Sequence, residues 1–340
     1  MDIKKITCLD DLKTVMNNLP EPDNRSRDLS KKRENKLTKP VGALGRLEEI
    51  VSWLATWQGS AQPEILNPAC IIFAGNHGVV VKGVSAFPSE VTNQMVQNFD
   101  AGGAAINQLC KAANVSMQVV NFAVENPTKD ITQGPAMTEE EFLAAFKIGA
   151  SKVKSGIDLL CVGEMGIGNT TVASALSHAL FGGKAADWTG LGTGIDKTTL
   201  KTKIEVVALA ASTNKSDSKG PLELAISLGG FELSAIAGAV IAARLLRIPV
   251  ILDGFVVTAA VSPFEVEFPG ALDHCLVGHV SAELAHQKLL QKLGKKALLD
   301  LEMRLGEASG AVLAVPIVRA ATLCHKGMAT FGDAGVSNKK

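Results

Sequence analysis

The sequence lacks an excess of charge of either sign. Lys plus Arg and Asp plus Glu number 34 each, so the formal net charge is zero and no broad basic face is implied. The most apolar stretch, residues 233–243, falls well short of the roughly 20 residues that a membrane span needs. We therefore expect neither nucleic acid nor a membrane as a partner, and we expect a buried helix over 233–243.

The sequence also lacks paired cysteines. It contains no Cys-x-x-Cys pair, and no secretory signal precedes the cysteines. Scattered single cysteines inside apolar runs are typical of a reduced, cytoplasmic protein. The six are Cys8, Cys70, Cys110, Cys161, Cys275 and Cys324.

Three common catalytic motifs are missing. His274, His279 and His286 are five and seven residues apart, which does not place a ligand pair on one helix face, so we expect no metal. No Gly-x-Ser-x-Gly turn is found, and Gly192-Thr-Gly194 does not continue into a dinucleotide fingerprint. A hydrolase of that kind and a dehydrogenase both lose support, and we expect no cofactor.

What the chain does contain is an alternation of short apolar runs and helical segments. From residue 68 the clearest strands are 69–74, 116–122, 158–162 and 249–252, and helical patterns cover 89–113, 139–155, 170–180, 200–211 and 231–246. The interval 214–220 has the composition of an exposed loop. The alternation predicts an α/β fold, Rossmann-like, with a mainly parallel sheet and helices on both faces.

The most informative segment is a glycine turn, which we define as Gly163-Glu-Met-Gly-Ile-Gly-Asn-Thr170. Its glycines allow backbone N–H groups to approach an anion, and the helix that follows adds the positive end of its dipole. Asn169 stands where a nucleoside triphosphatase P-loop needs lysine, so a phosphomonoester is the expected ligand. The alternative is a tight strand-to-helix turn without a ligand.

Other polar residues follow the strands, where ligands of parallel sheets bind. His77 fits a base, a phosphate donor or a capping residue. Asp253 fits a ribose contact, a structural hydrogen bond or a loop cap. Lys203 on its helix would ordinarily be solvated. Glu307, between small residues, fits either a partly desolvated carboxylate or a helix-start glutamate.

Six motifs, in order, carry a resemblance to a known family. They are Leu37-Thr-Lys-Pro-Val-Gly-Ala-Leu-Gly-Arg-Leu-Glu48, Ala74-Gly-Asn-His-Gly-Val79, Gly83-Val-Ser-Ala-Phe-Pro88, the glycine turn with Thr171, Leu252-Asp-Gly-Phe255 and Arg304-Leu-Gly-Glu-Ala-Ser-Gly-Ala-Val-Leu-Ala314. From about residue 37 to about 330, the chain resembles the nicotinate-nucleotide–dimethylbenzimidazole phosphoribosyltransferase family of cobalamin lower-ligand synthesis.

The resemblance implies a homodimer whose subunit has two domains. An α/β phosphoribosyltransferase core would cover 60–285, and residues 1–59 with 286–340 would form a small helical domain that carries the catalytic glutamate. The implied reaction transfers the phosphoribosyl group of nicotinate mononucleotide to 5,6-dimethylbenzimidazole, giving α-ribazole 5′-phosphate and nicotinate.

The resemblance also implies residue roles. Glu307 would be catalytic. The phosphate or nucleotide would be bound by Gly163, Glu164, Gly166, Gly168, Asn169, Thr170, Lys203 and Asp253. By neighbourhood to the motifs, the lining of the base slot would be Ser85, Phe87, Met95, Met165 and Leu305, with ordinary packing as the alternative for each.

Two positions depart from the family pattern. Asn76 replaces the usual aspartate, which removes a negative charge near the expected site. Ala308 replaces a common glycine, and its methyl would narrow the base pocket. Two alternatives therefore stay open: transfer to a different base (adenine, another benzimidazole or a phenolic), or a nucleotide-binding protein without turnover.

Overall fold

The sheet is parallel throughout. The computed structural model describes residues 3–337 except 123, 216, 217 and 219. Six strands run in the order β2-β1-β3-β4-β5-β6. Their bounds are β1 (Pro68–Ala74), β2 (Ser116–Asn121), β3 (Leu159–Met165), β4 (Val250–Leu252), β5 (Cys275–Val280) and β6 (Ala297–Asp300). The four expected strands are confirmed; β5 and β6 were not predicted.

Helices cover both faces of this sheet. The longer ones are α1 (Leu9–Met16), α2 (Asn24–Glu34), α3 (Arg46–Gln58), α4 (Glu90–Asp100), α5 (Ala105–Ala113), α6 (Glu139–Lys152), α7 (Asn169–Phe181), α8 (Lys197–Lys215), α9 (Pro221–Leu228), α10 (Phe231–Leu245), α11 (Phe255–Glu267), α12 (Leu284–Lys292) and α13 (Ser309–Gly327). Short helical segments are η1 (Ile3–Lys5), η2 (Gly78–Lys82), η3 (Ala185–Asp187) and α14 (Phe331–Ala334).

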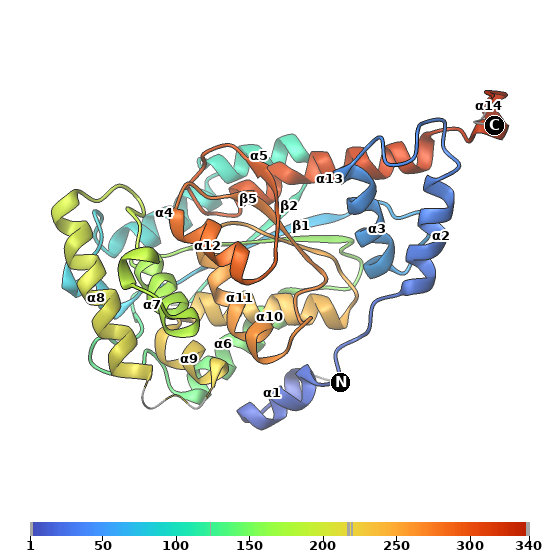
Figure 1. The fold of residues 1–340 in the computed structure, drawn as a ribbon. Coiled ribbons are helices and arrows are strands. Elements are labelled where there is room, and N and C mark those ends of the chain that lie inside the picture. Colours follow the sequence, from blue (N-terminus) through green and yellow to red (C-terminus); the bar gives the residue numbers. More distant parts are fainter. Residues whose placement is uncertain (1–2, 123, 216–217, 219, 338–340) are drawn as a thin grey trace.

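Alternate residues of the central strands enter two separate cores. In β1, Ile71 and Phe73 join the cluster on the side of α6, α10 and α11, whereas Cys70 and Ile72 join the cluster on the side of α3, α5 and α13. Figure 1 shows α5 and α13 above the sheet and α6, α10 and α11 below it. Burial of both faces explains why these strands read as continuous apolar runs.

Helix α10 is the buried helix expected over 233–243, because every residue from Glu232 to Arg244 is buried. No helix in the described part of the chain is long and apolar enough to cross a membrane. The expected helix over 89–113 is two helices, because the chain turns at Gly102 with φ +79°. Part of the expected loop over 214–220 lies outside the described residues, and Asn214 is not exposed but buried at the end of α8.

Segments from the two chain ends meet at the right of Figure 1. Leu37 and Thr330 form an antiparallel bridge, and Arg33 donates to the carbonyl of His325. However, α1 packs into the core of the sheet, and β6 is a strand of that sheet. The expected domain boundaries stay a prediction. We propose that the small helical unit comprises α2, α3, α14 and the end of α13.

Candidate functional site

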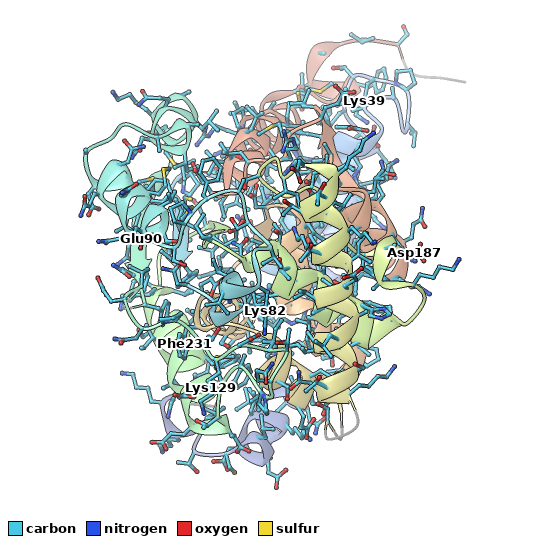
Figure 2. All side chains as sticks on the ribbon, turned by 90° about the vertical axis from the view of Figure 1, so that its left-hand side faces the viewer. Lys39, Lys82, Glu90, Lys129, Asp187 and Phe231 are labelled. Carbon is cyan, nitrogen blue, oxygen red and sulfur yellow. The ribbon has the colours of Figure 1, made fainter. Side chains whose placement is uncertain are left out.

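The site lies at the carboxyl edge of the sheet, where β1 and β3 are neighbours. The chain leaves β1 toward β2 on one side and leaves β3 toward β4 on the other, so this is the switch point of the topology. Gly75, after β1, donates its N–H to the carbonyl of Met165 at 3.0 Å. Figure 2 turns this edge toward the viewer, with Lys82 and Glu90 labelled.

The glycine turn is packed too closely for side chains. A Cβ on Gly166 would lie 2.4 Å from the carbonyl oxygen of Gly75, and one on Gly168, at φ +94°, would lie 2.7 Å from Val80. Helix α7 begins within the turn, at Asn169, so the positive end of its dipole lies there, while the N–H groups of Asn169 and Thr171 donate to the carbonyls of Gly166 and Gly168 at 3.2 and 3.0 Å. The turn therefore has the geometry of an anion seat.

Lys203 reaches this seat from α8. Its side chain is buried, and Nζ donates to Thr170 Oγ1 at 2.8 Å and to the carbonyl of Gly190 at 3.3 Å. Burial lowers the pKa of Lys203 to about 8, against the opposing charge of Glu283. One small pocket is lined by Lys203, residues 166–170 of the glycine turn, Ser85, residues 191–193 and Ile195.

The wall formed by residues 191–195 was missed at the level of sequence. Gly192 and Gly194 have φ of +54° and +114°, a signal for a special turn rather than for a dinucleotide site. Arg304 donates to the carbonyl of Gly192 at 2.7 Å. This bond ties the wall to the segment that carries Glu307.

Glu307 stands in a strained turn before α13. Its φ is +61° and that of Ala308 is +63°, both in the left-handed region. The N–H of Glu307 donates to the carbonyl of Glu164 at 3.2 Å, while its carboxylate Oε2 is buried without a hydrogen-bond partner among the described residues. Burial raises the pKa of Glu307 to about 7. Such a carboxylate is suited to accept a proton near neutral pH.

Glu164, the second residue of the glycine turn, links the Glu307 backbone to the start of α7. Asn169 Nδ2 donates to Glu164 Oε2, and burial, followed by the charge of Asp253, raises the pKa of Glu164 to about 8. Gly163 allows the Ala308 backbone to pack closely against β3, because a Cβ there would lie 2.1 Å from the backbone nitrogen of Ala308. The packing accounts for this glycine without a ligand contact.

Asp253 is fully buried at the end of β4. Its Oδ1 accepts from the N–H groups of Gly310 at 2.7 Å and Ala311 at 3.0 Å. Of the alternatives open from sequence, the geometry fits the structural hydrogen bond. An exposed ribose contact, which the expected nucleotide-binding role requires, does not fit this burial.

The five residues expected around a base differ in exposure. Ser85 lines the pocket of the glycine turn. Phe87 and Leu305 are about half exposed, at 47% and 51%. Met95 and Met165 are partly buried against the core on the α13 side. Their joint role in a base slot stays a prediction.

His77 is a scaffold residue beneath the glycine turn. It is fully buried, and Nε2 lies 2.6 Å from Glu232 Oε1. The Glu232 carboxylate also fills the space beside Gly75, Gly166 and Gly230. This burial leaves no room for a role as phosphate donor, and Glu232 itself carried no recognisable signal in the sequence.

The two departures from the family pattern have structural explanations. Asn76 donates to the carbonyls of Ser89 at 3.1 Å and Val124 at 2.8 Å, and accepts from Thr92 at 2.6 Å. Ala308 is fully buried in the core on the α13 side. The expectation that its methyl narrows a base pocket is therefore wrong, because that methyl packs over Gly163.

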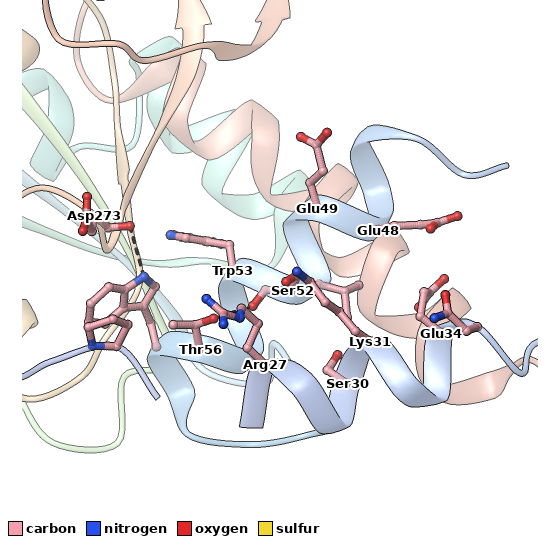
Figure 3. Close-up of a pocket in the computed structure, with 14 residues that line it drawn as sticks. Arg27, Ser30, Lys31, Glu34, Glu48, Glu49, Ser52, Trp53, Thr56 and Asp273 are labelled. Atoms are coloured by element: carbon pink, nitrogen blue, oxygen red, sulfur yellow. Dashed lines mark hydrogen bonds between the residues drawn. The ribbon is translucent and has the colours of Figure 1, made fainter. Parts of the chain in front are cut away.

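A larger cavity lies elsewhere, at the helical end of the molecule. It measures about 590 Å³ and lies between α2 and α3. Figure 3 shows Arg27, Trp53 and Thr56 around it. Trp57 Nε1 donates to the carbonyl of Asp273 at 3.0 Å. Size alone would misplace the site, because this cavity lies at the amino edge of the sheet. Among the described residues, no group of His, Cys, Asp and Glu is arranged to hold a metal ion.

Comparison with known proteins shows close similarity over nearly the whole chain. A family model described as phosphoribosyltransferase matches residues 19–336. The nicotinate-nucleotide–dimethylbenzimidazole phosphoribosyltransferase of Rhizobium rhizogenes is 53% identical over 330 residues, covering 97% of both chains. Its counterpart in Brucella anthropi is 52% identical over 331 residues, covering 97% of this chain and 98% of that one.

Solved structures agree with the sequence comparison. A crystal structure of CobT from Thermus thermophilus has a TM-score of 0.87 at 42% identity, covering 93% of this chain and 100% of that chain. A structure of the nicotinate-nucleotide–dimethylbenzimidazole phosphoribosyltransferase from the same organism has a TM-score of 0.86 at 41% identity, with the same coverage.

Proposed function

Since this chain belongs to the nicotinate-nucleotide–dimethylbenzimidazole phosphoribosyltransferase family and is an enzyme of cobalamin synthesis, we propose that Glu307 is its general base and that Lys203 and the glycine turn hold the phosphate. One observation carries these roles. The unpartnered Glu307 carboxylate and the pocket of Lys203 are joined through Arg304 and Gly192, so both belong to one site.

The phosphate of nicotinate mononucleotide would enter the pocket of the glycine turn. There it would meet the positive end of the α7 dipole and the ammonium of Lys203. Because the phosphate is remote from the reacting carbon, its binding energy serves to position the ribose. Thr170 Oγ1, which accepts from Lys203, keeps that ammonium aimed at the pocket.

The chemical step exchanges one C–N bond for another. The imidazole nitrogen of 5,6-dimethylbenzimidazole attacks C1′ from the face opposite nicotinate, and the ring N–H proton passes to Glu307. The bond from C1′ to nicotinate breaks, and its electron pair neutralises the pyridinium nitrogen. The configuration inverts from β to α, which gives α-ribazole 5′-phosphate and nicotinate. The negative Glu307 also stabilises positive charge that develops on the ribose.

A chromatographic assay with nicotinate mononucleotide and 5,6-dimethylbenzimidazole tests this proposal. Nicotinate and α-ribazole 5′-phosphate should appear in equal amounts, and Glu307→Gln should lower kcat by about 100-fold or more while nucleotide affinity stays nearly unchanged. An unchanged rate in Glu307→Gln would remove Glu307 from the mechanism. Nicotinate release only with another base would favour the alternative acceptors.

We also propose a homodimer located in the cytoplasm. The segment 37–48, which carries part of the family resemblance, lies at the helical end, far from the glycine turn in Figure 1, and exposes Val41 at 73%. A partner surface would account for that apolar exposure. All six cysteines are free, which suits a reducing compartment. Light scattering of the purified protein distinguishes dimer from monomer.

A further inference from the structure

The backbone turn that carries Glu307 has a conformation that is intrinsically unfavourable for residues with side chains. Gly306, Glu307 and Ala308 have φ of +85°, +61° and +63°, so three successive residues are left-handed and two of them carry side chains. L-residues enter this region only where their surroundings enforce it. Some neighbouring group must therefore hold the turn in place.

Asp253 is the side chain that anchors the far end of this turn. It follows β4, is fully buried, and accepts from the N–H groups of both Gly310 and Ala311 in the first turn of α13. Since α13 begins at Ser309, directly after the left-handed pair, these two bonds fix where the helix starts. They also satisfy two donors that a helix start leaves open.

The surroundings leave the turn little freedom to relax. A Cβ on Gly310 would lie 1.9 Å from His279 Nδ1, and one on Gly163 would lie 2.1 Å from the nitrogen of Ala308. On the near side, the N–H of Glu307 is held by the carbonyl of Glu164. The turn is thus fixed by β3 at one end and by Asp253 at the other.

Asp253 has no route to the substrate of its own. It is 0% exposed, and in the part of the chain that the structure describes no group forms a hydrogen bond with its second oxygen, Oδ2. The titratable side chains that face it are His279, whose Nδ1 lies 3.6 Å from Oδ1, the carboxyls of Glu307 and Glu164, and the thiols of Cys70 and Cys161. Its two hydrogen bonds from the α13 backbone are therefore the interactions through which it can act.

We propose that Asp253 is a positioning residue, which acts on the reaction by fixing the Glu307 turn and not by contacting the substrate. This inference rests on the proposed role of Glu307 as general base. Without the two bonds, the start of α13 can shift, the left-handed pair relaxes, and the Glu307 carboxylate moves from its buried position toward water.

Two substitutions at Asp253 separate hydrogen bonding from charge. Asp253→Ala removes the acceptor and should lower kcat by about 100-fold, while the KM for nicotinate mononucleotide changes by less than about threefold, because the glycine turn and Lys203 are unaffected. Asp253→Asn keeps an acceptor oxygen and should retain kcat within about tenfold. An unchanged kcat in Asp253→Ala, or an Asp253→Asn variant that folds but is as slow as Asp253→Ala, would overturn the proposal.

Asp158→Ala is the matched control. The Asp158 carboxylate also accepts from two successive N–H groups, those of Leu66 at 2.5 Å and Asn67 at 2.7 Å, but at the amino edge of the same sheet. Its loss should lower thermal stability without changing kcat. If Asp158→Ala lowers kcat as much as Asp253→Ala does, general destabilisation explains both, and the proposal fails.

Two readouts distinguish positioning from a merely structural role. In Asp253→Ala the acidic limb of the kcat profile should move to lower pH, because Glu307 gains solvent. The double variant Asp253→Ala/Glu307→Gln should be no slower than Glu307→Gln alone. If the two substitutions lower kcat multiplicatively in the double variant, or if the acidic limb does not move in Asp253→Ala, then Asp253 does not act through Glu307. A fully active Glu307→Gln single variant would instead refute the proposed function, so the two failures are distinguishable. If Asp253→Ala does not fold, Asp253→Ser in the same assays decides.

Discussion

His77 Nε2 lies 2.6 Å from Glu232 Oε1, and both side chains are wholly buried beneath the glycine turn. The pair joins the end of β1 to the first turn of α10. Glu232 occupies the space next to Gly75, Gly166 and Gly230, so this part of the turn rests on a carboxylate, whereas Gly168 packs against Val80. This packing explains why glycine is needed at several points of the site.

Gly166→Ala should disrupt the anion seat. The new Cβ would lie 2.4 Å from the Gly75 carbonyl oxygen and 3.2 Å from Glu232 Oε1, and a backbone oxygen cannot move aside cheaply. We expect the KM for nicotinate mononucleotide to rise by about tenfold or more. Gly327→Ala is the control, since apart from its chain neighbours and the backbone of its own helix no described atom lies within 4 Å of the added Cβ. Equal steady-state constants for Gly166→Ala and the parent protein would contradict this view of the turn.

Lys203→Met should weaken nucleotide binding while keeping most of the buried packing. A hydrogen bond to a charged partner contributes about 1.5–3 kcal/mol, so affinity should fall by roughly 10- to 100-fold. Calorimetric titration with nicotinate mononucleotide measures this. Lys201→Met, two residues away on the exposed side of α8, should bind normally. If both variants bind like the parent, the phosphate lies elsewhere.

The rate should depend on pH through Glu307 and Lys203. Burial raises the pKa of Glu307 to about 7, and the base must be deprotonated, so kcat/KM should fall below that pH. Burial lowers the pKa of Lys203 to about 8, and the cation must be protonated to attract phosphate, so kcat/KM should also fall above that pH. Initial rates measured across this pH range should give a bell-shaped profile of kcat/KM. Glu307→Gln should lose the acidic limb, and a limb that persists would have to belong to another group.

Glu164→Gln should change how stability depends on pH. Burial and Asp253 raise the pKa of Glu164 from 4.5 to about 8, so the unfolded chain loses this proton first and the native state loses stability as pH rises between those values. Between pH 4.5 and pH 8 the free energy of unfolding of the variant should therefore rise relative to that of the parent by roughly 1–3 kcal/mol. Denaturant unfolding at both pH values measures the gain. The exposed Glu205→Gln should show none.

Four of the strands and the glycine turn could be predicted from local patterns in the sequence. Short runs rich in apolar residues predicted β1 to β4, and three glycines before a helix marked the turn, because both are signals within about ten residues. β5 and β6 escaped prediction: β5 is interrupted by Gly278 and His279, and β6 is a short, half-buried edge strand. The contacts of Asp253, Glu232 and Arg304 span 57 to 155 residues. Chemistry that depends on such distant partners has no local sequence signal.

Asn76→Asp provides a last test, because it restores the aspartate that we take as usual in the family. Asn76 donates to the carbonyls of Ser89 and Val124 and accepts from Thr92. An ionised aspartate would place a negative oxygen against both carbonyl oxygens and keep only the bond from Thr92. Burying that mismatch should cost about 2–4 kcal/mol at pH 7. Since protonation returns one donor and removes the charge, the loss should shrink as pH falls toward about 4. Urea unfolding at the two pH values measures it, with Asn93→Asp on α4 as control. A variant as stable as the parent at pH 7 would mean that the amide of Asn76 is not required, and that the family's aspartate fits this pocket as well.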